Sequence, residues 1–237
     1  MKVSVVIPAL NEAEHVLHTL LSIQQQPGEF EIIVADGGSS DDTVKLVQPY
    51  ARVICCGRGR AIQMNVGARQ TTGEALLFLY ADTTLPPQGL AHLCQALAEG
   101  AVGGTFCLRF DLENFWLKLY TFFTRFRFRY FHYGDQGIFV KRTVFEQLGG
   151  FKEIPLMEDI DLICRLHQLG RVALIKTPVT TSARRYLEQG VVRQQLLNTW
   201  LVLLYMVGVS PQRLADWYWP EPSSSLASRF LKNIVHR

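Results

Sequence analysis

Hydrophobic residues in the first half of the chain fall into short runs that are separated by polar, glycine-containing loops. Four of these runs, most of them rich in β-branched residues, predict strands over residues 3–7, 31–35, 52–56 and 76–80. Helical periodicity between them predicts helices over about 11–25, 43–48 and 61–69. The uninterrupted apolar run at 76–80 is typical of a strand buried on both faces of a parallel sheet. This alternation predicts a doubly wound α/β fold, with a mostly parallel sheet and helices on both faces.

Polar side chains follow three of the predicted strands. Asn11 and Glu12 follow the first strand, Asp36 ends the second, and Asp82 follows the fourth. Right-handed crossovers bring the carboxyl ends of parallel strands to one edge of the sheet, so these side chains are expected to meet there. A carboxylate in that position can bind a hard divalent cation, which in turn can hold phosphates. The alternative for Asp82 is a cap on the following helix, and Asn11 is also predicted to be the N-cap of the first helix.

Composition and charge narrow the class of protein. The 237 residues suit a single domain with or without an appendage, and the 48% of hydrophobic residues suffices for a sizeable core. A net charge of +3 is too small to indicate a nucleic-acid-binding protein. The five cysteines are odd in number and have no C-x-x-C spacing, which indicates reduced thiols rather than disulfides or a zinc site. Together with the absence of a signal-like stretch before the first strand, this predicts a cytoplasmic protein.

A basic turn, Gly57-Arg58-Gly59-Arg60, precedes the helix predicted over 61–69. It is either a solvated turn or a contact to a diphosphate opposite the acidic loops, where two arginines would neutralise the phosphate charge. The first strand is not followed by G-x-G-x-x-G, and the chain contains neither a P-loop nor a G-x-S-x-G elbow. A dinucleotide site, a P-loop nucleotide site and an α/β-hydrolase are therefore not expected.

Two apolar segments stand out in the second half of the chain. Residues 115–133 interleave aromatic side chains with Arg125, Arg127 and Arg129, whereas residues 196–209 form an apolar run. The run is shorter than the roughly 20 residues that span a bilayer. Four interpretations remain open: contact with the inner face of a membrane, a pocket for a lipid or aromatic acceptor, a homodimer face, and helices of an enlarged core. Stacking on nucleic acid is disfavoured by the small net charge, and His132 is either a further ligand or a packed side chain.

Five motifs in order resemble those of a family 2 glycosyltransferase. They are Val-Val-Ile-Pro-Ala-Leu-Asn-Glu (5–12), Ala-Asp-Gly-Gly-Ser-Ser-Asp-Asp-Thr (35–43), Gly-Arg-Ala-Ile-Gln-Met-Asn-Val-Gly-Ala (59–68), Leu-Tyr-Ala-Asp-Thr (79–83) and Met-Glu-Asp-Ile-Asp-Leu (157–162). The details Gln-Met-Asn, Gly-Asp-Gln and Ser-Ala-Arg-Arg are most similar to a small bacterial subgroup, sometimes encoded beside radical-SAM proteins. The resemblance covers about residues 3–218. It implies the GT-A fold in one domain over 1–219, with a nucleotide-sugar-binding half (1–105), an acceptor half (106–219), and a linker with a basic tail (220–237).

The resemblance also implies an activity: an inverting transfer of a sugar from a nucleotide-diphospho-sugar to an acceptor, with Mg²⁺ or Mn²⁺. Asp82 corresponds to the direct metal ligand, Asp159 to the general base, and Glu158 orients the acceptor or holds Asp159. The positions implied for binding the donor or acceptor are Ala9, Asn11, Glu12, Asp36, Arg58, Arg60, Gln63, Ala81, Asp135 and Gln136. The alternative for Glu158 and Asp159 is that they complement the dipole at the start of their helix.

One residue departs from the family pattern, because Tyr80 stands where the first carboxylate of the D-x-D motif usually is. A phenol is uncharged at neutral pH, so the affinity for metal without nucleotide is expected to be low. This departure keeps open a non-catalytic nucleotide-sugar-binding or membrane-associated protein. A sugar nucleotidyltransferase is a lesser alternative, since it would carry a Gly-rich, Arg-containing loop after the first strand. The acceptor, which could be lipid-linked, the sugar and the base are not specified by the sequence.

Overall fold

The computed structural model describes residues 1–123, 125 and 134–219. The predicted linker and basic tail over 220–237, together with Arg127, Arg129 and His132, lie outside the described residues.

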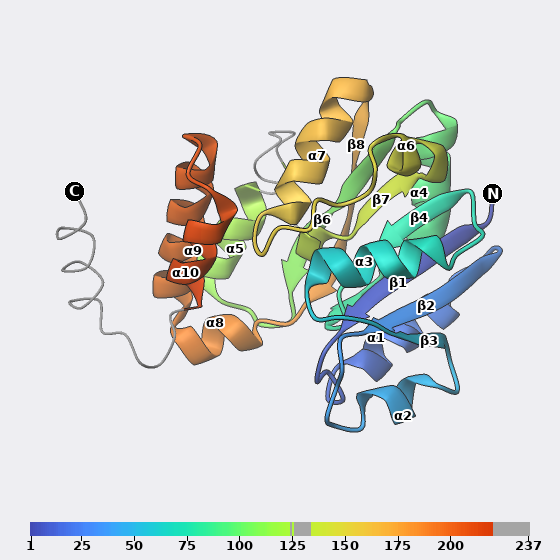
Figure 1. Ribbon diagram of the computed structural model, residues 1–237, viewed down its shortest axis with the longest axis horizontal. Coiled ribbons are helices and arrows are strands. Elements are labelled where there is room, and N and C mark those ends of the chain that lie inside the picture. The colour runs from blue at the N-terminus through green and yellow to red at the C-terminus, as the bar shows by residue number, and fades with distance from the viewer. Residues whose placement is uncertain (124, 126–133, 220–237) are drawn as a thin grey trace.

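One sheet organises the described part of the chain (Figure 1). Its eight strands are β1 (Val3–Ala9), β2 (Phe30–Asp36), β3 (Arg52–Cys55), β4 (Ala75–Phe78), β5 (Thr83–Thr84), β6 (Gly103–Phe110), β7 (Ile138–Lys141) and β8 (Val172–Thr181). Their order is β3-β2-β1-β4-β7-β6-β8-β5. β7 is antiparallel to both of its neighbours and β5 is antiparallel to β8, so the other six strands run in one direction. The predicted mostly parallel sheet is confirmed.

Helices cover both faces of this sheet, as predicted. They are α1 (Val16–Gln24), α2 (Thr43–Val47), α3 (Arg60–Arg69), α4 (Gly89–Ala98), α5 (Phe115–Phe123), α6 (Arg142–Gln147), α7 (Glu158–Leu169), α8 (Arg184–Gln189), α9 (Val191–Met206) and α10 (Pro211–Tyr218), with a short 3-10 helix, η2 (Gly134–Gln136). Side chains of α1 and α4 pack with Val5 and Ile7 in one buried cluster. Side chains of α3, α6 and α7 pack with Val6 in another. Consecutive residues of β1 thus face opposite layers, as the period of a strand requires.

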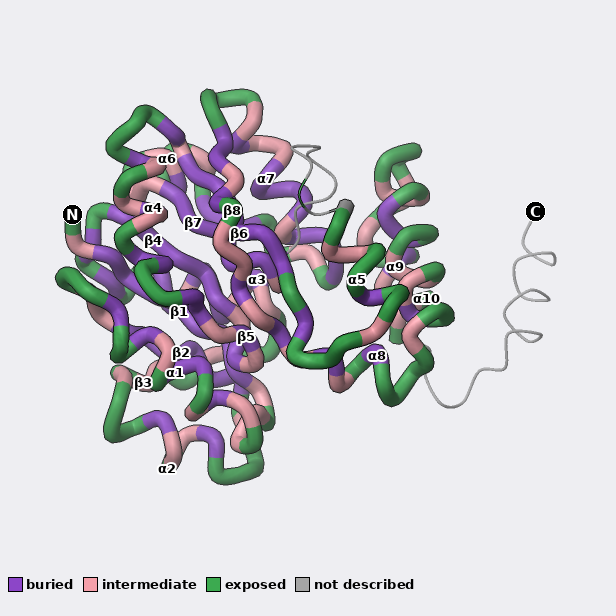
Figure 2. Tube along the Cα trace, turned by 180° about the vertical axis from the view of Figure 1, so that it is seen from behind, coloured by how far each residue is buried: buried purple, intermediate pink, exposed green. Residues whose placement is uncertain are grey.

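A third buried cluster attaches the C-terminal helices to the start of α7. Met157 and Ile160 pack there against Leu201 and Val202 of α9 and Leu214 of α10. These helices lie with α5 beside the sheet, on the flank away from the N-terminus (Figure 1). Figure 2 shows the central strands buried, whereas α9 and α10 are intermediate or exposed along much of their length. The chain therefore builds a sheet-centred body with a helical flank.

Two predictions about helix ends are wrong. The first helix begins at Val16 with His15 as its N-cap, because Asn11 adopts a left-handed backbone conformation, with φ 55°. The side chain of Asn11 instead accepts a 2.8 Å hydrogen bond from the main-chain amide of Ser40. The alternative reading of Asp82 as a helix cap is also excluded, since the N-cap of α4 is Gln88.

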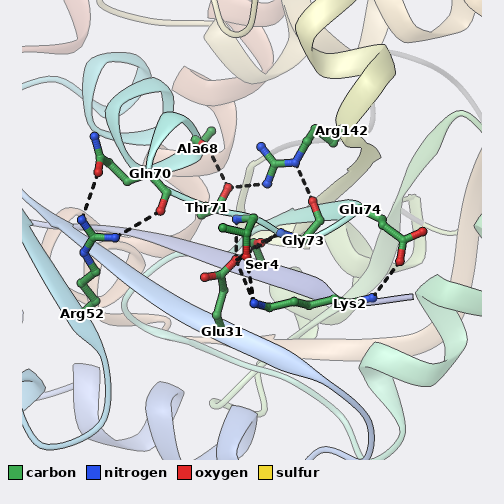
Figure 3. Close-up of polar contacts among 11 residues, drawn as sticks. Lys2, Ser4, Glu31, Arg52, Ala68, Gln70, Thr71, Gly73, Glu74 and Arg142 are labelled. Carbon is green, nitrogen blue, oxygen red and sulfur yellow. Dashed lines mark hydrogen bonds and ion pairs between the residues drawn. The ribbon is translucent and has the colours of Figure 1, made fainter.

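A polar network closes the edge of the sheet where the parallel strands begin (Figure 3). Glu31 accepts hydrogen bonds from the hydroxyl of Ser4 (2.7 Å) and the main-chain amide of Thr72 (2.6 Å). Arg142 donates to the carbonyl of Gly73 (2.6 Å) and to the hydroxyl of Thr71 (2.7 Å). The turn before β4 is thereby fixed to β1, β2 and α6, which leaves the opposite edge for the functional site.

Candidate active site

A cavity of about 770 Å³ lies at the carboxyl ends of the parallel strands. Ala9 of β1, Phe110 of β6 and Thr181 of β8 line it, together with the segment Tyr80–Asp82 that follows β4. The turn before α3, the start of α7 and the helices α8–α10 complete its wall. This is the edge at which open α/β sheets bind ligands. Of the predicted site residues, those that line the cavity are Ala9, Glu12, Arg58, Arg60, Gln63, Ala81, Asp82, Asp135 and Asp159.

Asp159 is fixed at the start of α7 with its carboxylate in the cavity. One oxygen, Oδ2, accepts a 2.7 Å hydrogen bond from the main-chain amide of Gly134, and Oδ1 accepts one of 2.7 Å from the amide of Ile160. An ionised carboxylate has about four acceptor positions, so the hydrogen bonds from the described residues occupy only part of them. These bonds orient the carboxylate without saturating it, as a proton acceptor requires.

Glu158 does not line the cavity and pairs with Arg60. The distance from Arg60 Nε to Glu158 Oε1 is 3.0 Å, and the Glu158 side chain is only 1% exposed. Burial raises the pKa of Glu158 to about 7, although the guanidinium of Arg60 opposes that shift. Arg60 also donates a 3.2 Å hydrogen bond to the hydroxyl of Tyr80. Glu158 thus holds a cation at the cavity wall, and Tyr80 contacts another nitrogen of the same guanidinium.

Asp135 places another carboxyl group in the cavity, on a half-buried side chain. It lies in η2, between Gly134 and the fully buried Gln136. Its Oδ1 is buried and has no hydrogen-bond partner in the part of the chain that the structure describes. Burial, with smaller contributions from Asp159 and Asp82, raises the pKa of Asp135 from 3.8 to about 7. A carboxyl group in this state is suited to donate a hydrogen bond to a substrate oxygen.

Asp82 supplies the carboxylate that follows β4. Its main-chain carbonyl accepts a 3.1 Å hydrogen bond from Ser182, next to the end of β8, which fixes its position between two strands. Among the described residues, no group of three or more His, Cys, Asp or Glu side chains is placed to hold a metal ion. One carboxylate together with diphosphate oxygens and waters fits the octahedral, oxygen-based preference of Mg²⁺ or Mn²⁺. Asp82 therefore fits a divalent cation for which other oxygen ligands complete the octahedron.

The side chains of three predicted binding residues form hydrogen bonds with main-chain atoms at the strand ends and in the loops that follow them. The carboxylate of Asp36 accepts hydrogen bonds from the main-chain amides of Gly38 (2.9 Å) and Ser39 (3.0 Å), and Asp36 is buried and does not line the cavity. Gln63 donates from Nε2 to the carbonyls at the ends of β1 and β2, at 2.8 and 2.9 Å. Asn11 joins the loops after the same strands. These residues shape the floor and rim of the site.

Sequence reasoning left two arginines of the cavity without a role. Arg184 lies 3.1 Å from the carboxylate of Glu12, and Arg185 donates a 2.8 Å hydrogen bond to the hydroxyl of Tyr218. Burial raises the pKa of Glu12 even though Arg184 opposes this. Both arginines begin α8, shortly after the carboxyl end of β8. The strand-end rule that indicates Asp82 would indicate them too, once the place of β8 in the sheet is known.

Solved structures identify the class of fold. Over 98% of this chain and 79% of the other, the protein is similar to the mannosyltransferase PcManGT from Pyrobaculum calidifontis in complex with GDP-Man and Mn²⁺ (TM-score 0.62, 22% identity). It is also similar to S. aureus TarS 1-349 in complex with UDP-GlcNAc, over 77% of this chain and 58% of that one (TM-score 0.61, 18% identity). The fold is that of the GT-A glycosyltransferases.

The sequence gives the family. Residues 4–148 match the family described as "Glycosyl transferase family 2", and the chain belongs to it. A relative in Bacillus subtilis, "Probable glycosyltransferase YdaM", is 27% identical over 71% of this chain and 47% of its own length. The undecaprenyl-phosphate 4-deoxy-4-formamido-L-arabinose transferase of Proteus mirabilis is 33% identical over 42% of this chain and 34% of its own. The beta-monoglucosyldiacylglycerol synthase of Trichormus variabilis is 27% identical over 70% of this chain and 41% of its own length. The chain spans less than half the length of these relatives.

Proposed function

We propose that this protein transfers a sugar from a nucleotide-diphospho-sugar to an acceptor hydroxyl, with inversion at the anomeric carbon. The observation that supports this most directly is the arrangement of one cavity. Asp159, held by a main-chain amide, lines the same cavity as Asp82 and the arginines Arg58 and Arg60. A proton acceptor and a set of groups for a diphosphate are the two parts that a direct displacement requires.

In the proposed reaction the acceptor oxygen attacks the anomeric carbon as the bond from that carbon to the diphosphate oxygen breaks. Asp159 takes the proton of the acceptor hydroxyl, and the bonding electron pair leaves with the nucleoside diphosphate. Arg60, which Glu158 holds at 3.0 Å, and the exposed Arg58 stabilise the negative charge that develops on the leaving group. Asp135 orients the acceptor or the sugar through Oδ1, which has no hydrogen-bond partner among the described residues.

A divalent cation belongs to this proposal, with Asp82 as its protein ligand. When bound, it supplies charge neutralisation of the diphosphate. Mn²⁺ accompanies GDP-Man in the Pyrobaculum mannosyltransferase structure, which supports Mn²⁺ or Mg²⁺ here. Tyr80 replaces the usual first carboxylate and accepts a hydrogen bond from Arg60. The Arg60 guanidinium therefore contributes a fixed positive charge in the part of the site where that carboxylate would otherwise lie.

The acceptor in this proposal is hydrophobic or lipid-linked. Leu201, Val202 and Trp219 bring apolar surface to the cavity from the C-terminal helices. Two relatives carry names that refer to undecaprenyl-phosphate and to a glucosyldiacylglycerol. With all five cysteines free, the proposed location is the cytoplasmic face of a membrane.

The test is nucleoside diphosphate release from a panel of UDP- and GDP-sugars, with Mn²⁺, Mg²⁺ or EDTA. Slow hydrolysis of one donor that stops in EDTA is the expected result, and Asp82→Ala is the matched variant without the metal ligand. Tight binding of a nucleotide sugar without any turnover, in the presence of hydrophobic acceptors, would instead favour a non-catalytic binding protein. Tyr80 is the feature that favours that second candidate.

A further inference from the structure

All four tryptophans of the chain lie on the helical flank and are exposed to solvent. Trp116 belongs to α5 and Trp200 to α9, whereas Trp217 and Trp219 lie in and just after α10. Their exposed fractions are 49%, 58%, 47% and 51%, in that order. Tryptophan is a large, mostly apolar side chain that is normally well buried, so its confinement to one exposed region needs a partner that covers it.

The outer face of α9 carries a continuous apolar stripe. Val192, Leu196, Trp200, Leu203 and Val207 follow one another at spacings of three or four residues, and each is exposed by 43% or more. The stripe is about 22 Å long at the rise of an α-helix. The other face of α9 packs into the buried cluster around Leu201, so the helix is apolar on both sides. Phe115, Leu119 and Phe122 make a second exposed stripe on α5, which contacts α9. We call these two stripes and the four tryptophans the tryptophan flank.

The described parts of these segments carry an excess of positive charge. Residues 111–123, 125 and 184–219 contain six Lys and Arg against four Asp and Glu. Arg193 on α9 and Arg213 on α10 are exposed beside the apolar stripes. The flank thus combines exposed aromatic residues with an excess of positive charge.

We propose that the tryptophan flank docks on the surface of an anionic lipid bilayer. Tryptophan favours the interface between lipid and water, and arginine favours anionic headgroups. A two-fold contact between copies of this chain would bring the positive segments against each other, which disfavours a homodimer through this face. None of the helices in the described residues is long and apolar enough to cross a membrane, so the contact is one of surface docking.

Docking on this face would bring the bilayer to the cavity. Leu201 and Val202 line the cavity from the same helix that carries Trp200 and Leu203 on its outer side, and Trp219 belongs to both surfaces. An acceptor with a lipid tail could then enter from the bilayer without crossing water. This last step rests on the proposed function, whereas the docking itself does not.

The test uses the intrinsic fluorescence of the full chain, because all four tryptophans report on this one region. Vesicles of phosphatidylcholine alone, and of phosphatidylcholine with phosphatidylglycerol in equal parts, are titrated into the protein without nucleotide. We expect a blue shift of the emission, quenching by brominated lipid, and co-sedimentation with the anionic vesicles only, with binding that weakens as salt is added.

A matched pair of double variants locates the contact. Trp200→Ser with Leu203→Ser removes two side chains of the flank, and we expect at least tenfold weaker binding to anionic vesicles. Leu21→Ser with Leu169→Ser removes exposed leucines of α1 and α7, with 43% and 40% exposure, and should bind as the wild type does. Circular dichroism checks that both variants are folded.

Three outcomes overturn the proposal: no binding to anionic vesicles, equal weakening in both variants, or a concentration-dependent dimer whose tryptophans brominated lipid cannot quench. The vesicle assay contains no sugar donor, so it separates the two proposals. Donor hydrolysis without vesicle binding would reject only the docking surface, and vesicle binding without hydrolysis would reject only the enzyme.

Discussion

The main-chain amide of Gly134 donates a 2.7 Å hydrogen bond to the carboxylate of Asp159. This bond joins η2 to the first turn of α7, and its two residues lie 25 positions apart in the chain. It fixes the orientation of the carboxylate, and it places Asp135, the next residue of η2, beside it. The proposed base and its neighbouring acid are therefore positioned by one backbone contact.

Asp159→Asn is expected to lower kcat by about 100- to 10,000-fold, since it removes the proton acceptor at nearly constant volume. In the proposed reaction the nucleoside diphosphate lies on the opposite side of the anomeric carbon from Asp159, so its dissociation constant should change less than twofold. Steady-state kinetics and isothermal titration calorimetry measure the two quantities. A variant that keeps most of its turnover would show that another group accepts the proton.

Gly134→Ala is expected to disrupt the same contact from the other side. A Cβ atom at this position would lie 2.0 Å from the hydroxyl oxygen of Tyr80 and 2.5 Å from its Cζ, so the backbone or the ring must move. Such overpacking typically costs about 1–3 kcal/mol of unfolding free energy. Thermal denaturation should show the loss, and kcat should fall because the amide leaves Asp159.

The double variant Gly134→Ala with Tyr80→Leu tests whether the clash with the Tyr80 ring causes the loss of stability. Leucine has no atoms where the hydroxyl and Cζ of Tyr80 lie, so the double variant should be more stable than the sum of the single changes predicts. Additive losses would mean that Gly134 matters for a reason other than its contact with Tyr80.

The sequence was sufficient to predict the edge of the sheet at which the site forms. Strand-end positions alone brought Glu12 and Asp82 together, because parallel strands must end on one side. The family motifs added Asp159 and Asp135. Asp135 lies just before β7, which runs antiparallel to both of its neighbours, so the start of β7 lies at the edge where the parallel strands end. That reversal brings Asp135 to the cavity, and periodicity does not reveal it.

Side-chain partners were harder to predict than backbone positions. Asp36 sits at the predicted edge, yet its carboxylate binds the main chain of its own loop, as short Asp-Gly-Gly-Ser segments favour. Gln63 likewise binds main-chain carbonyls, at the ends of β1 and β2. The ion pair of Glu12 with Arg184 spans 172 residues of sequence. Arg184 can be recognised as the partner of Glu12 only from the position of β8 in the sheet, and tertiary packing sets that position.

The buried carboxyl group of Asp135 predicts a pH dependence of stability. Its pKa is raised from 3.8 to about 7 by burial first, and then by the carboxylates of Asp159 and Asp82. Between these values the folded protein holds a proton that the unfolded chain has released, so the unfolding free energy falls as pH rises. Asp135→Asn is neutral at every pH and should remove part of this fall.

Melting temperatures of the wild type and Asp135→Asn at pH 4 and pH 8 measure the effect. The two proteins should be similarly stable at pH 4, whereas at pH 8 the variant should be more stable, by up to about 4 kcal/mol for a shift of three pKa units. Glu158, whose pKa is also raised to about 7, remains in the variant and keeps part of the slope. Equal pH slopes for both proteins would contradict an uncharged Asp135.

Metal binding should depend on the nucleotide, because Asp82 is the only carboxylate left of the D-x-D pattern and Tyr80 is held against Arg60. Calorimetry with Mn²⁺ alone is expected to give a dissociation constant in the millimolar range or weaker, since one carboxylate leaves most of the octahedron to water. Adding nucleoside diphosphate should tighten Mn²⁺ binding at least tenfold, and Asp82→Ala should abolish this coupling. Linkage requires Mn²⁺ to tighten the nucleotide by the same factor, which provides an independent check. Micromolar Mn²⁺ binding to the protein alone would mean that further ligands complete the site without the diphosphate.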